Sequence, residues 1–210
     1  MQERAALTRR ALIGTAAAEF DSHGYEGTTL ARICKAAGIS IGALSYHFAA
    51  KRNLAEAVAH QGEVAVRDMA ERVLARQGRA LESAIGLTLE LARLLERDVT
   101  VRAAARLGAE LRFDWSAACL STVSLLLEEA SAEGQLRSGA APASLATLAA
   151  YLVGGAESRI RARSGQPGAG EQRAADELAE IWAIVMPEVR ATVAKGNGRR
   201  PDGKPDRQYL

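Results

Sequence analysis

A chain of 210 residues with 48% hydrophobic and 25% charged residues can bury a core, either as one domain or as a small domain joined to a larger one. Its 27 lysines and arginines nearly balance its 25 aspartates and glutamates, so the net charge alone identifies no nucleic-acid partner. No apolar run approaches the ~20 residues of a membrane-spanning helix, and the polar start lacks a signal-peptide core, which predicts a cytoplasmic protein that does not bind membranes.

Apolar residues recur at helical spacing along most of the chain and alternating strand patterns are scarce, which predicts an all-α fold. A first helix is expected over 5–22. A second begins at Thr28 or Thr29, whose hydroxyl can cap it, and ends at Gly38. A Gly-rich loop at 164–170 precedes the last helix. The remaining helices are predicted over 41–48, 51–75, 80–96, 99–108, 111–133, 142–163 and 174–194.

The second and third helices are separated only by Gly38-Ile39-Ser40, the tight glycine-containing turn that is typical of a helix-turn-helix. Ser40 can cap the third helix with its hydroxyl. A short helix that exposes small residues, here Gly42 and Ala43, fits a major groove about 12 Å wide. This arrangement predicts double-stranded DNA as a partner.

Four segments, in their order and spacing over roughly residues 8–60, resemble the N-terminal DNA-binding domain of the TetR family of transcriptional repressors: Phe20 to Leu30, Ala36 to Ser40, Gly42 to Phe48 and Lys51 to Leu54. The resemblance implies a three-helix DNA-binding domain at 1–52, within a family-style extent of about 8–68 that has its helix-turn-helix at about 29–50. It also implies a helical ligand-binding and dimerisation domain at 53–195 and derepression when the ligand binds. The composition of 196–210 predicts a disordered tail.

The DNA contacts are expected on the helix-turn-helix and the positions next to it. Hydroxyls at helix starts offer hydrogen bonds to phosphates, and small residues let a helix approach base edges. By resemblance, Tyr46, His47 and Lys51 match family positions that hold the phosphate backbone; the alternatives are a partly buried ring for Tyr46 and a plain helix-surface residue for His47. The candidate residues are Thr28, Thr29, Ser40, Ile41, Gly42, Ala43, Ser45, Tyr46, His47 and Lys51.

Two letters of the third helix depart from the family pattern. Position 41, commonly polar or basic in relatives, is Ile, and Ser45 stands where a tyrosine is usual. Each change removes a possible DNA contact worth about 1–3 kcal/mol, so the target sequence or affinity is expected to differ from that of relatives. A basic N-terminal arm with Arg4, Arg9 and Arg10 can compensate through backbone or minor-groove contacts.

The larger domain contains Trp115, one of only two tryptophans in the chain. Three features are similar to the γ-butyrolactone receptors of actinobacteria: the string Gly42 to Lys51, Trp115 within 111–133, and Glu180-Ile181-Trp182. In those receptors the tryptophan that matches Trp115 lines the signal pocket. A plain core aromatic is the alternative reading of Trp115. The candidate ligand-binding residues are Trp115, Tyr151, Gln61, Leu87 and Leu91, of which the leucines fit a solid core equally well.

Dimerisation is expected through the last two helices, by a stripe of Leu145, Leu148, Ala149 and Leu152 and a stripe of Leu178, Ile181, Ile184, Val185 and Val189. A two-fold dimer predicts a palindromic operator. No catalytic motif, cofactor-binding motif or metal-ligand spacing is present in the sequence, so an enzyme is not expected. The remaining alternative is a pseudo-receptor or signal-binding protein with altered or weakened DNA reading, which responds to an antibiotic or another ligand.

Overall fold

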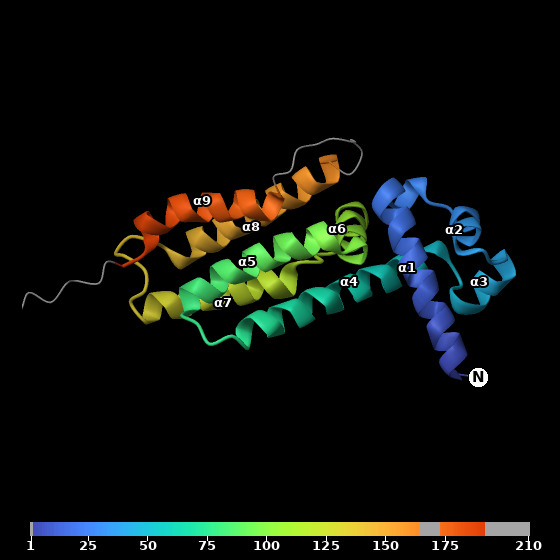
Figure 1. The fold of residues 1–210 in the computed structure, drawn as a ribbon, viewed down its shortest axis with the longest axis horizontal. Coiled ribbons are helices and arrows are strands. Elements are labelled where there is room, and N and C mark those ends of the chain that lie inside the picture. The colour runs from blue at the N-terminus through green and yellow to red at the C-terminus, as the bar shows by residue number, and fades with distance from the viewer. Residues whose placement is uncertain (1, 164–172, 192–210) are drawn as a thin grey trace, which may run out of the picture.

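A computed structural model describes residues 2–163 and 173–191 of the chain, and within these residues it is built from helices and one isolated β-bridge, Leu136 to Arg190 (Figure 1). The all-α prediction is confirmed. The helices are α1 (Gln2–Gly27), α2 (Leu30–Ala37), α3 (Ile41–His47), α4 (Lys51–Leu74), α5 (Ala80–Arg97), α6 (Val99–Leu111), α7 (Ala117–Ala132), α8 (Pro142–Arg163) and α9 (Ala174–Val189).

The N-terminal helices α1, α2 and α3 pack around a small core with the first half of α4 and part of α6. Phe20 of α1, Ile33 of α2, Leu44 of α3 and Leu54 of α4 are fully buried there. Gly38 ends α2 with φ +67°, a left-handed conformation that glycine adopts without the penalty of a Cβ atom. This compact unit holds α2 and α3 in a fixed relation to each other.

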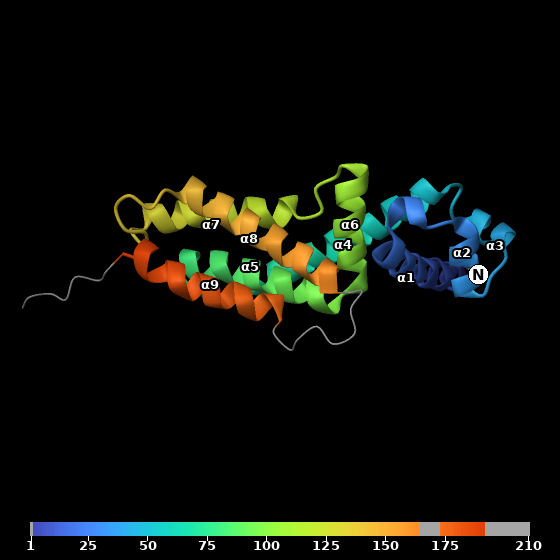
Figure 2. The ribbon, with the colours of Figure 1, turned by 90° about the horizontal axis from the view of Figure 1, so that it is seen from above.

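The larger part of the protein is a bundle in which α5 packs against α4, α7, α8 and α9 (Figures 1 and 2). Leu87, Leu91 and Leu95 of α5 are fully buried at its centre. Cys119 is buried in the same core and carries a free thiol, and burial raises the pKa of this thiol to about 11. No helix among the described residues is both long enough and apolar enough to span a bilayer.

Helix α6 lies across the long axis of the molecule, between the bundle and the N-terminal unit (Figures 1 and 2). Its side chains belong to both cores: Val101 and Ala105 to the bundle, Ala103 and Leu107 to the N-terminal unit. Contact with α4 is close, because a Cβ atom on Gly62 would overlap the Cβ of Ala104. Movement of α6 therefore cannot occur without repacking one core or the other.

Several predicted helix boundaries were wrong, among them the start of α1, which is at Gln2, and the end of α6, which is at Leu111 rather than at 108. The first helix continues beyond 22 to Gly27, with a kink at Gly24 where φ is +70°. The helix predicted over 111–133 begins only at Ala117, because Arg112 takes a left-handed conformation (φ 60°) and ends α6. The last helix ends at Val189 rather than at 194. The predicted loop at 164–170 and the predicted tail at 196–210 lie outside the described residues.

The two stripes expected to form a dimer surface mostly face the protein's own core. Leu145, Ala149 and Leu178 are buried, and the group Leu148, Leu152, Val185 and Val189 packs against that core. Of the predicted stripes only Ile181 and Ile184 of α9 are exposed, and α8 exposes Tyr151, which was not part of either stripe. Helices α8 and α9 therefore each bury an inner apolar stripe in the bundle and expose further apolar side chains on their outer face.

Candidate nucleic-acid interface

Helix α3 presents its first turn to solvent while its centre is anchored in the core. Ser40 caps the helix, its Oγ accepting a hydrogen bond from the Ala43 amide at 3.1 Å, as the sequence predicts. Leu44 is fully buried, which fixes the rotation of the helix about its axis. Ile41, Gly42 and Ala43 are exposed as a result, with Ile41 at 56% of its full accessibility.

The end of α3 carries Tyr46 and His47. The Tyr46 ring is 82% exposed and has an edge-to-face contact with the His47 ring, with centroids 5.2 Å apart. The partly buried alternative for Tyr46 is therefore wrong, whereas His47 is half-buried. Ser45 is exposed beside them. Both rings offer polar atoms at the protein surface from the helix that also exposes Ile41.

Helix α2 begins at an exposed cap, because Thr29 Oγ1 accepts a hydrogen bond from the Arg32 amide at 3.2 Å. Arg32 and Lys35 on the next turn line an open groove with Thr29, and Arg32 is held by Glu19 at 2.5 Å. These two cations were missed in the sequence reading. The two cations are three residues apart and follow a helix cap, so both lie on one helix face. This pattern could have identified them from the sequence.

Two of the candidate DNA-contacting residues have other partners in the structure. Thr28 is completely buried, and its hydroxyl donates to the Glu19 carbonyl at 3.1 Å. The Lys51 ammonium donates to the carbonyls of Tyr25 (2.9 Å) and Thr28 (3.1 Å) and lies 4.1 Å from the centroid of the Tyr25 ring. These side chains brace the connection from α1 to α2 against α4, so the expectation that they reach out to phosphates is corrected.

The N-terminal basic residues belong to a helix rather than to an extended arm. Helix α1 begins at Gln2, and the guanidinium of Arg9 lies over the Phe48 ring, 4.8 Å from its centroid. Arg10 on the next position is exposed. Helical backbone leaves no free strand to enter a minor groove here, so the exposed Arg9 and Arg10 form a charged edge of the N-terminal unit.

Comparisons with known proteins agree with this geometry. The family model of bacterial regulatory proteins, tetR family, matches residues 12–58, which contain α2 and α3. The solved structure of CprB, a TetR family protein of Streptomyces coelicolor in complex with its biological operator sequence, is 30% identical, with a TM-score of 0.74, and the match covers 90% of this chain and 92% of CprB. This chain belongs to the TetR family.

Two further relatives narrow the position within the TetR family. The A-factor receptor protein of Streptomyces griseus is 26% identical over an alignment of 196 residues, which covers 90% of this chain and 66% of the receptor. A γ-butyrolactone receptor described as ArpA-like is 28% identical in its crystal structure, with a TM-score of 0.71 and 90% of each chain covered. This TetR-family protein is therefore a transcriptional regulator related to the γ-butyrolactone receptors. The relatives named above are receptors and regulators rather than enzymes.

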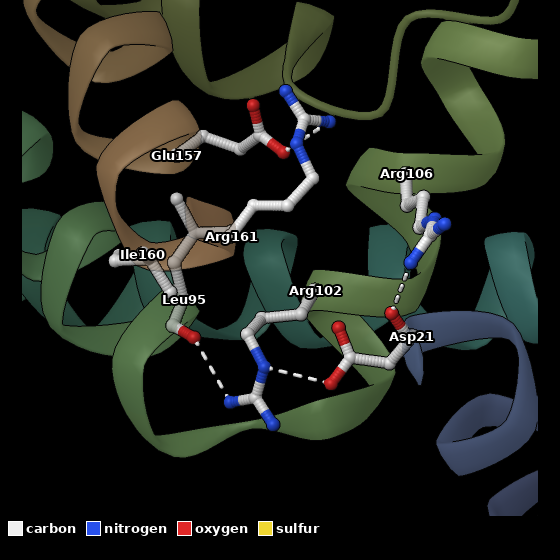
Figure 3. Close-up of a pocket in the computed structure, with 7 residues that line it drawn as sticks. All are labelled: Asp21, Leu95, Arg102, Arg106, Glu157, Ile160 and Arg161. Carbon is white, nitrogen blue, oxygen red and sulfur yellow. Dashed lines mark hydrogen bonds and ion pairs between the residues drawn. The ribbon is translucent and has the colours of Figure 1, made fainter. Parts of the chain in front are cut away.

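The N-terminal unit and the bundle meet at Asp21 of α1, which forms an ion pair and a backbone hydrogen bond with α6 (Figure 3). Arg102 Nε donates to the Asp21 carboxylate at 2.9 Å, and Arg106 Nη1 donates to the Asp21 carbonyl at 2.7 Å. One turn further along α6, Glu110 accepts from the Tyr25 amide at 2.6 Å. Positions 102, 106 and 110 are four residues apart, so one face of α6 holds α1.

Helix α8 lies on the other side of this junction. Glu157 and Arg161 of α8 form an ion pair at 2.9 Å and line a narrow pocket with Asp21, Arg102 and Arg106 (Figure 3). Burial raises the pKa of the Glu157 carboxyl above its usual value, and the nearby Arg161 guanidinium lowers it in part. The pocket thus brings charged groups of α1, α6 and α8 next to one another.

The five candidate ligand-binding residues occupy different environments. Trp115 is half-buried in the connection between α6 and α7, and Leu87 and Leu91 are fully buried in the core of the bundle. Gln61 is exposed and Tyr151 is 77% exposed, so these two side chains do not line an enclosed pocket within the single chain.

The sequence analysis gave no site role to Trp182 of α9, the more buried of the two tryptophans. Its indole Nε1 donates to Thr88 Oγ1 of α5 at 2.9 Å, and both side chains are buried. Thr88 is a polar residue within the apolar stripe of α5, and this exception in the pattern could have pointed to a buried hydrogen bond. This pair ties the last helix to the central one.

Proposed function

We propose that this TetR-family regulator is a homodimeric repressor that releases a palindromic operator when a small hydrophobic signal binds in the helical bundle near Trp115. The signal is of the γ-butyrolactone, butenolide or furan type. Support comes from relatives that match nearly the whole chain: the A-factor receptor protein, an ArpA-like γ-butyrolactone receptor and CprB, which was solved with its operator.

The observation that carries the proposal is the position of α6 between Trp115 and α1. A Cβ atom on Gly108 of α6 would lie 3.2 Å from Trp115 Cδ1 and 2.7 Å from the Phe113 carbonyl oxygen, so the connection after α6 packs directly on the helix. The same helix holds Asp21 of α1. A signal that displaces Trp115 therefore pushes on α6 and, through it, on the DNA-binding unit. The signal needs only a higher affinity for the displaced conformer.

The proposed dimer surface is the outer face of α8 and α9. Tyr151, Ile181 and Ile184 are exposed there, and the exposed Gly154 and Gly155 of α8 allow a second copy to approach closely. A two-fold dimer places two α3 helices on one face of DNA, about 34–36 Å apart or a multiple of that distance. Two identical half-sites in inverted orientation follow from this symmetry.

The repressor proposal is tested by selecting duplex DNA from a random pool with the purified full chain at low salt and then adding synthetic γ-butyrolactones to the selected complex. We expect an enriched inverted repeat and its release by at least one lactone, but not by the ring-opened hydroxy acid of the same carbon skeleton. If the folded dimer enriches no duplex, the DNA-binding proposal fails. If lactones, butenolides and furans all leave the complex intact, the pseudo-receptor alternative takes its place.

Asp21→Asn is expected to weaken the link between signal and DNA. Loss of the carboxylate charge opposite Arg102 lowers the free energy of unfolding by about 1–2 kcal/mol, since the pair is only partly exposed. Because α1 then follows α6 less closely, the signal concentration for half-release rises about fivefold or more in the gel-shift titration. The control is Glu90→Gln, which breaks an ion pair within α5 alone. Release by Asp21→Asn at the wild-type concentration would rule out this link.

A further inference from the structure

The recognition helix α3 has an unusual set of side chains for a helix that reads DNA. Its sequence, Ile41-Gly-Ala-Leu-Ser-Tyr-His47, contains no Lys, Arg, Asn, Gln, Asp or Glu. Arg and Lys identify guanine, and Asn and Gln identify adenine, each by a two-point hydrogen bond to the base edge. Ser45, Tyr46 and His47 do not supply that two-point pattern. Helix α3 therefore has no side chain that distinguishes a purine by the usual means.

The first turn of α3, which in a helix-turn-helix contacts the base edges, is instead apolar and exposed. Ile41 is 56% exposed at the first helical position, and Ala43 is exposed two residues later, with Gly42 between them. Buried Leu44 and the Ser40 cap prevent the helix from turning Ile41 inward. The protein thus holds a branched apolar side chain in solvent at the position that enters the groove.

A single apolar group is available to such a side chain in the major groove of B-DNA, the C5-methyl group of thymine. We propose that Ile41, with Ala43 beside it, reads thymine methyl groups, so that each operator half-site has a thymine where the first turn of α3 meets the groove. This inference rests on the proposed function, because it assigns the specificity of that same interface. Sequence reading at α3 then depends on burial of methyl groups rather than on hydrogen bonds to purines.

The positions of the positive charges agree with this assignment. Arg10 of α1, Lys35 of α2 and Arg52 of α4 are exposed on the helices around α3, and none lies on α3 itself. Cations at such positions neutralise phosphates, which adds affinity without sequence information. The basic residues therefore bind the DNA backbone, whereas Ile41 selects the base.

The test uses the full-length dimer and the duplex that it selects from a random pool. Each thymine of one half-site is replaced in turn by deoxyuridine, which removes only the methyl group. At the thymine under Ile41 we expect the dissociation constant to rise about fourfold for one half-site and about 15-fold when both are changed. Replacing that thymine–adenine pair by cytosine–guanine weakens binding, and 5-methylcytosine at the same position recovers about fourfold of the loss.

Ile41→Ala connects the methyl group to the side chain. Ile41 is exposed in the free protein, so its truncation leaves folding intact, which circular dichroism checks. The variant is expected to bind thymine and deoxyuridine duplexes within twofold of each other, while the control Ser45→Ala keeps the fourfold difference. If deoxyuridine has no effect at any thymine of a tightly bound duplex, the inference is overturned and the proposed function stands. A deoxyuridine penalty at the thymine under Ile41 that persists in Ile41→Ala also overturns it. If no duplex is selected, the proposed function itself fails.

Discussion

Replacing Ile184 by Glu is expected to convert the proposed dimer to a monomer and to lower the affinity for the operator roughly 100-fold. Ile184 is 75% exposed on α9, so a charge there does not disturb the core of the single chain. In a dimer formed through α8 and α9, the two-fold axis brings the carboxylate close to that of the second copy, and burying these like charges disfavours association. A monomer contacts one half-site and loses the gain that a linked second half-site provides.

Light scattering coupled to gel filtration measures the mass of the Ile184→Glu variant, and a gel-shift titration measures its affinity for the selected duplex. The matched control is Leu125→Glu on α7, where the wild-type side chain is 70% exposed but lies outside α8 and α9. That variant is expected to remain dimeric and to bind DNA normally. A dimeric Ile184→Glu protein with wild-type affinity would show that the dimer uses another face.

The helix-turn-helix could be predicted almost to the residue because local rules determine it. Thr29 and Ser40 cap the helices that follow them, and Gly38 ends α2 in a left-handed conformation, all as the sequence predicts. Caps and glycine termini depend on side chains within three or four residues of the helix end, so no knowledge of the tertiary structure is needed.

Two of the predictions that failed did so for different reasons, one because the partners are distant in the sequence and one because a left-handed residue interrupts an apolar pattern. Lys51 binds carbonyls of residues 25 and 28, more than 20 positions away, and no local pattern reveals that its ammonium turns inward. The apolar pattern over 111–133 reads as one helix, yet Arg112 ends α6, and the Asp114 carboxylate accepts from the Ser116 amide at 3.0 Å ahead of α7. That short loop places Trp115 over α6 rather than inside a helix. It also changes Trp115 from a residue of α7 into a contact of α6.

The largest expected loss of stability follows from Trp182→Ala, about 3–5 kcal/mol in the free energy of unfolding. The indole fills the space between α5 and α9 and is almost completely buried. Trp115→Ala, which truncates a half-buried ring at the edge of the bundle, is the matched control and is expected to cost less than half as much. Urea denaturation followed by circular dichroism measures both. Equal losses for the two variants would contradict the assignment of Trp182 as the core tryptophan.

The hydrogen bond from Trp182 to Thr88 can be separated from the volume of the ring by a double-mutant cycle. Trp182→Phe keeps an aromatic ring, and the Thr88 hydroxyl still donates to the Ile85 carbonyl at 2.7 Å. Thr88→Val instead leaves the buried indole N–H of Trp182 without a hydrogen-bond acceptor. Thr88→Val is therefore expected to cost more in the wild-type background than in Trp182→Phe, by about 1 kcal/mol. Trp182→Phe also leaves Trp115 as the only tryptophan of the chain. Its fluorescence then reports directly whether the signal reaches the residue that packs on α6, independently of any change in DNA binding.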